Sequence, residues 1–151
     1  MTIRPATRDD GTRVIEMALR FLEETPYGVT LSGATPSSLA AVFEAVLELG
    51  VIFVAESCCG RLDGFLAIAA LRHPLTGRLY ADEIAWWVEP EARRGTVGAR
   101  LLAEAEAWAR ARQLGLVKMA APAGSHVGRF YERMGYQAVE TAYQKTLSPA
   151  S

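Results

Sequence analysis

The segment that follows Val88 has the residue types and spacing of an anion-binding site. The chain leaves a predicted buried strand there, turns at Pro90 and enters a predicted helix. Small residues lie at the helix start with arginines around them: Arg93, Arg94, Gly95, Thr96, Gly98 and Arg100. The first N–H groups of a helix have no partner within it, and the helix dipole favours anions there. The segment indicates a phosphate or pyrophosphate site, although an ordinary glycine-assisted turn with solvated arginines would use the same residues.

Two common phosphate-binding motifs do not fit this segment. An NTPase P-loop ends in Gly-Lys-Ser or Gly-Lys-Thr so that the lysine reaches the terminal phosphates, and the chain has no such triplet. A dinucleotide fingerprint needs Gly-x-Gly-x-x-Gly beside the first strand, with an acid about twenty residues further on. The glycine spacing here differs from that pattern. A P-loop nucleotide and a dinucleotide are therefore disfavoured as ligands.

Hydrophobic periodicity predicts the elements that position this loop. Four segments have helical spacing: 7–24, 35–50, 98–114 and 125–134. Six segments are typical of strands: 3–6, 51–56, 65–71, 79–88, 116–120 and 136–147, the last as one strand or a bent pair. Thr7 with Asp10 predicts a capping box, and Thr35 with Pro36 predicts a second helix start. Residues 27–35 are predicted as a loop.

The order of these elements predicts the fold class. Strand, helix and strand from Ile84 to Ala120 form a βαβ unit, which requires a parallel strand pair. The three strands before it suggest an antiparallel meander. We therefore expect an α/β (mixed α+β) protein with a mixed, mostly antiparallel sheet, a central parallel pair and flanking helices. Ligands of open α/β sheets bind outside the carboxyl ends of the strands, where the loop after Val88 lies.

Two motifs resemble those of the GNAT superfamily of acetyl-coenzyme A dependent N-acyltransferases. Pro90-x-x-Arg93-x-x-Thr96-x-Gly98, followed by Leu101-Leu102, resembles its pyrophosphate loop. The segment 130–136, Phe-Tyr-Glu-Arg-Met-Gly-Tyr, resembles its Leu-Tyr-Glu-x-x-Gly-Phe segment. The element order is also that of the family over nearly the whole chain. The resemblance implies the acyl-CoA N-acyltransferase fold, with a single N-acetyltransferase domain at 1–147 and a loose tail at 148–151.

The resemblance implies acetyl-CoA as cosubstrate, held by the loop and the preceding strand. The residues expected to bind it are Trp87, Val88, Arg93, Arg94, Gly95, Thr96, Val97, Gly98 and Ala99. The backbone N–H of Trp87 or Val88 would face the acetyl carbonyl. Two positions depart from the family pattern: Thr96 replaces a usual glycine, and Gly124 falls where an asparagine often contacts the pantetheine arm.

Two side chains are candidates for catalysis by the same resemblance. The family's fourth strand often opens with a glutamate that removes the ammonium proton directly or through water, and the segment from Glu83 to Val88 resembles that strand start. Tyr131 matches the tyrosine that can protonate the departing thiolate. Glu83 could equally be a solvated acid at a strand start, and Tyr131 a half-buried aromatic that packs the last helix.

Composition excludes several other classes of protein. Charged residues make up 22% of the chain, and the formal net charge is −1. The sequence contains no block of like charges, so nucleic-acid binding is not expected. No apolar run reaches the roughly 18 residues of a membrane span, and the start of the chain has no signal core. Cys58 and Cys59 are adjacent, so no disulfide framework is expected, which favours a cytoplasmic location. With His73 and His126 as the only histidines, no metal site is expected.

The sequence therefore predicts an N-acetyltransferase that moves an acetyl group from acetyl-CoA to a primary amine by direct attack in a ternary complex. The amine would belong to a small molecule or a peptide. The alternative is an inactive CoA-binding sensor or scaffold module, which Thr96 and Gly124 support. A small structural α/β domain is a third reading. The resemblance also allows a homodimer, since homodimers are frequent in the family.

Overall fold

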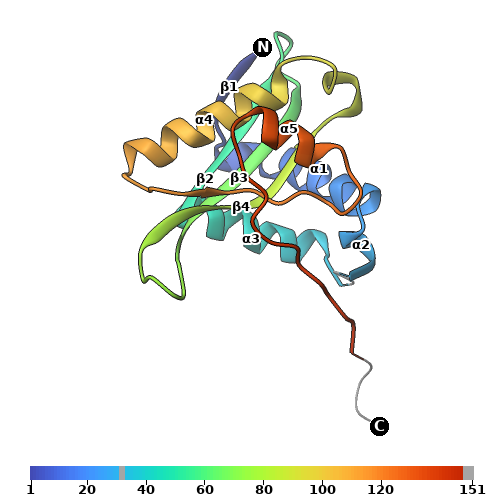
Figure 1. Ribbon diagram of the computed structural model, residues 1–151. Coiled ribbons are helices and arrows are strands. Elements are labelled where there is room, and N and C mark those ends of the chain that lie inside the picture. The colour runs from blue at the N-terminus through green and yellow to red at the C-terminus, as the bar shows by residue number, and fades with distance from the viewer. Residues whose placement is uncertain (31–32, 148–151) are drawn as a thin grey trace.

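A mixed β-sheet forms the centre of the molecule in the computed structural model, which describes residues 1–30 and 33–147 (Figure 1). Its strands are β1 (Thr2–Pro5), β2 (Gly50–Glu56), β3 (Leu62–Arg72), β4 (Leu79–Val88) and β5 (Val117–Lys118). They lie in the order β1-β2-β3-β4-β5, with antiparallel pairing from β1 to β4 and a parallel β4–β5 pair at the end. The predicted mixed, mostly antiparallel sheet with one parallel pair is confirmed.

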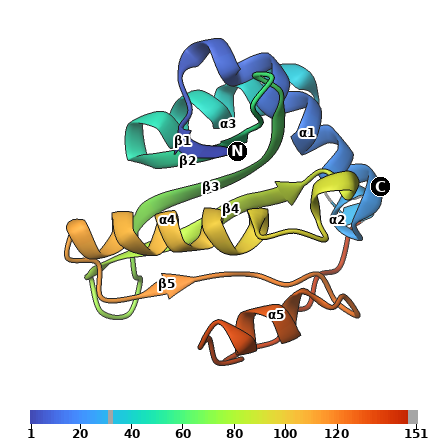
Figure 2. The same ribbon diagram turned by 90° about the horizontal axis from the view of Figure 1, so that it is seen from above.

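Helices cover both faces of this sheet (Figure 2). They are α1 (Gly11–Glu24), α2 (Tyr27–Thr30), α3 (Pro36–Leu49), α4 (Val97–Ala111) and α5 (Val127–Arg133), with one-turn 3-10 helices η1 (Arg8–Asp10) and η2 (Pro90–Ala92). Alternation along the strands divides the core into two clusters. Ile52, Val54, Phe65 and Ala67 pack against α1 and α3 on one face. Phe53, Ala55, Leu66 and Ile68 pack against α4 on the other.

Both predicted helix starts are present. The carboxylate of Asp10 accepts a hydrogen bond from the N–H of Thr7 at 2.8 Å and binds the guanidinium of Arg4 at 2.8 Å. The side chain of Thr35 accepts from the N–H of Ser38 at 3.1 Å, with Pro36 at the first helical position. The bonds from the N–H groups of Thr7 and Ser38 each satisfy a donor that the helix start would otherwise leave without a partner.

Strand β4 contains a bulge, and beyond it the sheet opens. Ala67 pairs with Ala85 and Ile68 pairs with Glu83, so Ile84 is an extra residue on β4. Such a bulge bends the strand and increases its twist. The parallel pairing joins only Ala81 and Asp82 of β4 to β5. After β5 the chain runs away from β4 (Figure 2), and Glu83 lies at the point where the two diverge.

Two predictions about local structure were wrong. Residues 27–35 were predicted as a loop, yet the helix α2 occupies Tyr27–Thr30; residues 31–32 lie outside the described part of the chain. Residues 136–147 were predicted as strand, yet no strand forms there. A strand needs a partner for its backbone, and β5 offers only two residues at its edge. The polar link from this segment to β5 is the ion pair between Glu140 and Lys118 at 2.9 Å.

The remaining boundaries agree with the predicted segments to within a few residues. The tail predicted at 148–151 lies outside the described residues. Among the helices of the described residues, none has the length and apolar character needed to cross a membrane.

Candidate active site

The predicted coenzyme loop lies directly after β4 and leads into the first turn of α4. Its backbone is held by short-range hydrogen bonds from Ala92 N–H to Glu89 C=O at 2.8 Å and from Gly95 N–H to Ala92 C=O at 3.3 Å. Thr96 precedes α4, and its side chain makes no capping hydrogen bond to the helix. The first N–H groups of α4 are therefore not used by a capping side chain, which leaves them available to an anion.

Gly98 is required by the packing of α4 on the sheet. A Cβ atom at Gly98 would lie 3.0 Å from Cζ2 of Trp86 on β4, closer than side-chain packing normally allows. A Cβ atom at Gly95 would meet only the carbonyl of Ala92, at 3.7 Å. Gly98, which matches the last glycine of the family motif, therefore lets the start of α4 approach β4 closely.

The two arginines of the loop have different surroundings. Arg93 Nε donates to the carbonyl of Val88 at 2.8 Å, and Arg93 Nη2 lies 3.3 Å from Glu24 Oε2 on α1. The Arg93 guanidinium also stacks on the indole of Trp87, with 4.4 Å to the ring centroid. Arg94 is exposed and has no ion pair with any described residue. Arg94 is thus the loop cation that is free to meet a phosphate.

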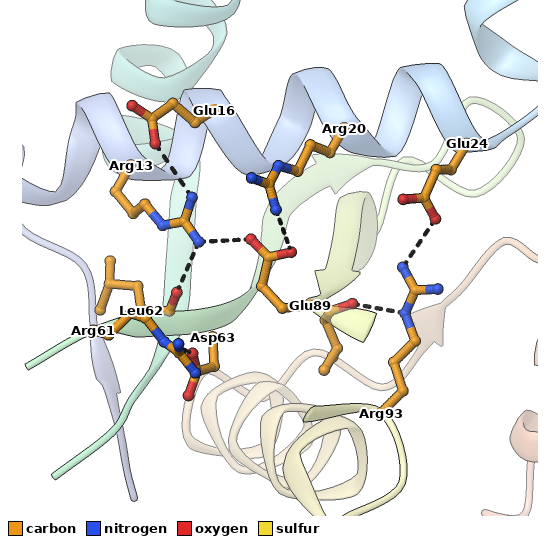
Figure 3. A network of polar contacts seen from close by, with 10 residues as sticks. Arg13, Glu16, Arg20, Glu24, Arg61, Leu62, Asp63, Glu89 and Arg93 are labelled. Carbon is orange, nitrogen blue, oxygen red and sulfur yellow. Dashed lines mark hydrogen bonds and ion pairs between the residues drawn. The ribbon is translucent and has the colours of Figure 1, made fainter. Parts of the chain in front are cut away.

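Figure 3 shows Glu89, a buried acid directly after β4 that the sequence analysis did not identify. The side chain of Glu89 is 5% exposed and binds two arginines of α1, Arg13 at 2.6 Å and Arg20 at 2.9 Å. Its backbone N–H donates to the carbonyl of Asp63 on β3 at 2.8 Å. The only sign of this buried acid in the sequence is its position between an apolar strand and a proline turn. Acids at such positions are usually solvated, so the position alone does not indicate burial.

The two catalytic candidates meet at one residue of the opposite segment. Oε2 of Glu83 accepts a hydrogen bond from the N–H of Ala120 at 2.7 Å. The hydroxyl of Tyr131 donates to the carbonyl of Ala120 at 3.1 Å. Tyr131 is buried at 6% exposure and stacks on Trp86 at 5.6 Å between ring centroids. Two positions 48 residues apart in the chain therefore face the gap between β4 and the segment after β5.

The electrostatics of this pair suit proton transfer. Glu83 is a half-buried residue with a buried carboxyl group, and this burial raises the pKa of Glu83 to about 7 against the opposing effect of the Ala120 N–H. Burial and the negative charge of Glu83 raise the pKa of Tyr131 above its ordinary value. Near neutral pH, Glu83 can therefore accept a proton while Tyr131 keeps one to donate.

Tyr27 of α2 lies within electrostatic reach of Glu83. Burial, and then the charge of Glu83, raise the pKa of Tyr27 on α2. The ring of Tyr27 lies 5.6 Å from that of Phe21 on α1. Residue 27, which the sequence placed in an uncharged loop, is thus brought to the acid by a short helix.

The strand register distinguishes the two backbone candidates on β4. Hydrogen-bonded and non-hydrogen-bonded pairs alternate along an antiparallel ladder. Val88 pairs with Gly64, and the bond from Glu89 N–H to Asp63 C=O marks the next pair as hydrogen-bonded. The N–H of Val88 is therefore directed away from β3, toward the open edge, whereas that of Trp87 faces β3.

The neighbouring tryptophans point to opposite faces of β4, as strand alternation predicts. Trp87 packs with Val14 and Met17 of α1, and Trp86 packs with the α4 cluster. Within the described residues, both indole N–H groups are buried without a hydrogen-bond partner. Each face of β4 near the site therefore has a buried indole donor without a partner among the described residues.

Other residues considered in the sequence lie away from the pair. Cys58 and Cys59 are exposed in the β2–β3 turn, and His73 lies in the β3–β4 turn, where its N–H donates to Arg78 C=O at 2.8 Å. His126 is exposed at the start of α5. Gly124 has a φ of +74°, a left-handed conformation that favours glycine. No cluster of three or more potential metal ligands was found in the described parts of the chain.

A mixed sheet that opens between β4 and β5, a glycine-containing helix start and a paired acid and tyrosine together form one candidate active site of an α/β protein. The family model described as "Acetyltransferase (GNAT) domain" matches residues 48–138, which is more than half of the chain. The chain belongs to the GNAT acetyltransferase family.

Solved structures share this fold across their full lengths. A crystal structure of a probable acetyltransferase is 22% identical, with 100% of this chain and 99% of that chain covered and a TM-score of 0.75. The aminoglycoside antibiotic 6'-N-acetyltransferase AAC(6')-IG from Acinetobacter haemolyticus is 17% identical over 99% and 100% of the two chains, with a TM-score of 0.75. The ribosomal-protein-alanine N-acetyltransferase from Brucella melitensis biovar Abortus 2308 is 17% identical over 97% and 98%, with a TM-score of 0.76. A comparison with curated protein sequences gave no match.

Proposed function

We propose that the protein transfers an acetyl group from acetyl-CoA to a primary amine by direct attack within a ternary complex. The observation that carries this proposal is the pairing of Glu83 and Tyr131 across Ala120, with a carboxyl pKa of about 7 beside a tyrosine whose pKa is raised. A group that takes a proton and a group that gives one are both needed for this reaction.

The reaction uses each group once. Ionised Glu83 takes a proton from the acceptor ammonium, directly or through a water molecule, which frees the nitrogen lone pair. The amine nitrogen attacks the thioester carbonyl, a C–N bond forms and the C–S bond breaks. Tyr131 donates its proton to the departing thiolate, and the second proton that the nitrogen loses as the amide forms restores the Tyr131 hydroxyl. The proton on Glu83 passes to solvent. The products are an acetylated amine and free coenzyme A.

The loop and β4 supply the groups that acetyl-CoA requires. The N–H of Val88 is directed to the open edge of β4, where it can donate to the acetyl carbonyl. The uncapped start of α4, with the hydroxyl of Thr96 and the exposed Arg94, supports pyrophosphate binding. Thr96 in place of glycine leaves the donors of the helix start in position, because its side chain is not committed to capping.

The acceptor is proposed to be an amine attached to a neutral or aromatic group. Tyr27, which lies within electrostatic reach of Glu83, forms an aromatic pair with Phe21. Residues 25–35 contain no acid that would attract a polycation. Aromatic surfaces bind flat or apolar groups well and also tolerate a cation. Both a small molecule and a peptide end fit this description.

A thiol-release assay with acetyl-CoA and an amine panel tests the proposal. The panel should contain arylalkylamines, aminoglycosides, polyamines and peptides that begin with alanine. We expect amine-dependent thiol release, with arylalkylamines ahead of polyamines. Tight binding of acetyl-CoA without thiol release for any amine would favour the alternative, a CoA-binding sensor or scaffold. A melting temperature that acetyl-CoA does not change would favour a structural domain.

A further inference from the structure

Helix α1 is tied to the segment after β4 by two separate links (Figure 3). In the first, Arg13 and Arg20 bind the two oxygens of Glu89 at 2.6 Å and 2.9 Å. In the second, Glu24 binds Arg93 at 3.3 Å. The three α1 residues that make these links occupy one side of the helix, and all project toward the loop (Figure 3). We call this set of contacts the α1 brace.

The first link is the stronger one because its acid is buried. The side chain of Glu89 is 5% exposed, whereas those of Glu24 and Arg93 are 48% and 44% exposed. A buried carboxylate needs its cationic partners, since removing one partner leaves a charge that water cannot reach. An exposed ion pair contributes little. Glu89 is therefore the centre of the brace.

The brace fixes the backbone from which the coenzyme loop starts. Glu89 directly follows Val88, its N–H is held by Asp63 on β3, and its side chain is held by α1. Arg93 then returns to the carbonyl of Val88 at 2.8 Å. The segment from Val88 to Arg93 thus has a hydrogen bond between its two ends and is attached to both β3 and α1. Between Arg93 and the start of α4, the backbone is held by the hydrogen bond from the N–H of Gly95 to the carbonyl of Ala92.

We infer that Glu89 is a positioning residue for coenzyme binding, and that α1 acts through it to hold the phosphate-binding backbone in place. This inference rests on the proposed function, because it assigns the loop to acetyl-CoA. It also separates the two loop arginines: Arg93 belongs to the brace, and Arg94 faces the ligand. Preorganised donors bind an anion more tightly than donors that must first be ordered.

Asp63→Asn provides a matched control for Glu89→Gln. Asp63 is a second buried carboxylate at the same β3–β4 end, with a side chain 5% exposed, but its partner is Arg61 at 2.6 Å and not a residue of α1. Both variants remove one buried charge and keep the side-chain shape. Arg20→Gln is a milder variant because the side chain of Arg20 is 53% exposed. It lies on α1, so the loop sequence stays unchanged.

Three measurements test the inference. Hydrogen exchange on the coenzyme-free protein should show faster exchange for amides 93–98 in Glu89→Gln, and less so in Arg20→Gln, but not in Asp63→Asn. Calorimetry should show acetyl-CoA affinity weakened about ten-fold by Glu89→Gln, which is about 1.4 kcal/mol. The KM for acetyl-CoA should rise with the loss of affinity while the KM for the amine stays close to wild type, which a general loss of structure would not allow.

Unchanged exchange at 93–98 in both Glu89→Gln and Arg20→Gln would overturn the inference, as would equal weakening by Asp63→Asn. If the wild type itself bound no acetyl-CoA, the proposed function would fail, and the exchange comparison alone would then decide whether Glu89 holds the loop. Failure of Glu89→Gln to fold would move the comparison to Arg20→Gln against Asp63→Asn.

Discussion

Replacing Glu83 by glutamine should make the folded protein more stable at alkaline pH while it removes activity. In the wild type, the ionised carboxylate is buried, and burial raises its pKa from 4.5 to about 7. Glutamine has nearly the same shape, and its carbonyl oxygen can still accept the hydrogen bond from Ala120 that the carboxylate accepts at 2.7 Å. The substitution therefore removes the charge and little else.

The size of the effect follows from the pKa. One pKa unit corresponds to about 1.4 kcal/mol, so a rise from 4.5 to about 7 makes ionised Glu83 about 3 kcal/mol less stable in the folded state. Below pH 4.5 the carboxyl is protonated in both states. Between pH 4.5 and about 7 the unfolded chain loses the proton and the folded protein keeps it, so folding stability falls as pH rises. Above that range the full cost is present.

Urea denaturation of both proteins at about pH 4 and about pH 8.5 measures this change. We expect the stability of Glu83→Gln relative to wild type to increase by about 3 kcal/mol between the two pH values. Asp10, whose pKa is lowered to about 2, titrates below this window and is present in both proteins. Replacing the exposed Glu104 by glutamine controls for the loss of one charge.

The pH dependence of turnover should reflect the ionisation of the Glu83 carboxyl. The wild-type rate should rise with pH through about 7 as Glu83 ionises. The loss caused by Glu83→Gln should then be largest above that pH. A stability difference that does not change with pH would refute the reasoning, because it would mean that Glu83 ionises as readily in the folded protein as in the unfolded chain.

Three other predictions concern the loop and the tyrosine. Tyr131→Phe should lower kcat about a hundred-fold with little change in coenzyme affinity; unchanged kcat in steady-state kinetics would remove Tyr131 from the mechanism. Gly98→Ala should lower the free energy of unfolding by about 1 to 3 kcal/mol because of its contact with Trp86, whereas Gly95→Ala should stay within about 0.5 kcal/mol; equal effects in urea titrations would contradict the packing argument. Arg94→Gln should weaken coenzyme binding and flatten its dependence on salt, measured by calorimetry at low and high ionic strength; an unchanged salt dependence would mean that Arg94 does not meet the phosphates.

Much of the fold was predictable from local patterns. The strand at 79–88 is confirmed to the residue because apolar runs and the flanking turn signals agree there. The helix starts predicted at Thr7 and Thr35 are confirmed. They could be predicted because a capping contact joins residues only three positions apart in the sequence. The strand predicted at 136–147 fails for the opposite reason: β-propensity describes a residue's fitness for a sheet, and a partner edge must still be supplied by the rest of the molecule.

The sequence named candidate residues for the site, but it could not predict their contacts. Glu83 and Tyr131 were identified by resemblance, yet their meeting at Ala120 depends on the bulge at Ile84 and the divergence of β5. No periodicity in the sequence marks a one-residue bulge. Glu89 was overlooked because its partners, Arg13 and Arg20, lie 76 and 69 residues away. Long-range ion pairs of this kind leave no trace in local spacing.

The central claim is tested most directly by following both products of one reaction. Purified protein should be incubated with acetyl-CoA and the best amine from the panel, with free thiol measured by absorbance and the amine by mass spectrometry. We predict that thiol and acetylated amine form in equal amounts, and that Glu83→Gln and Tyr131→Phe reduce both together. Thiol release that does not depend on the amine, or coenzyme binding with no acetylated product, would contradict the claim that this chain is an amine acetyltransferase.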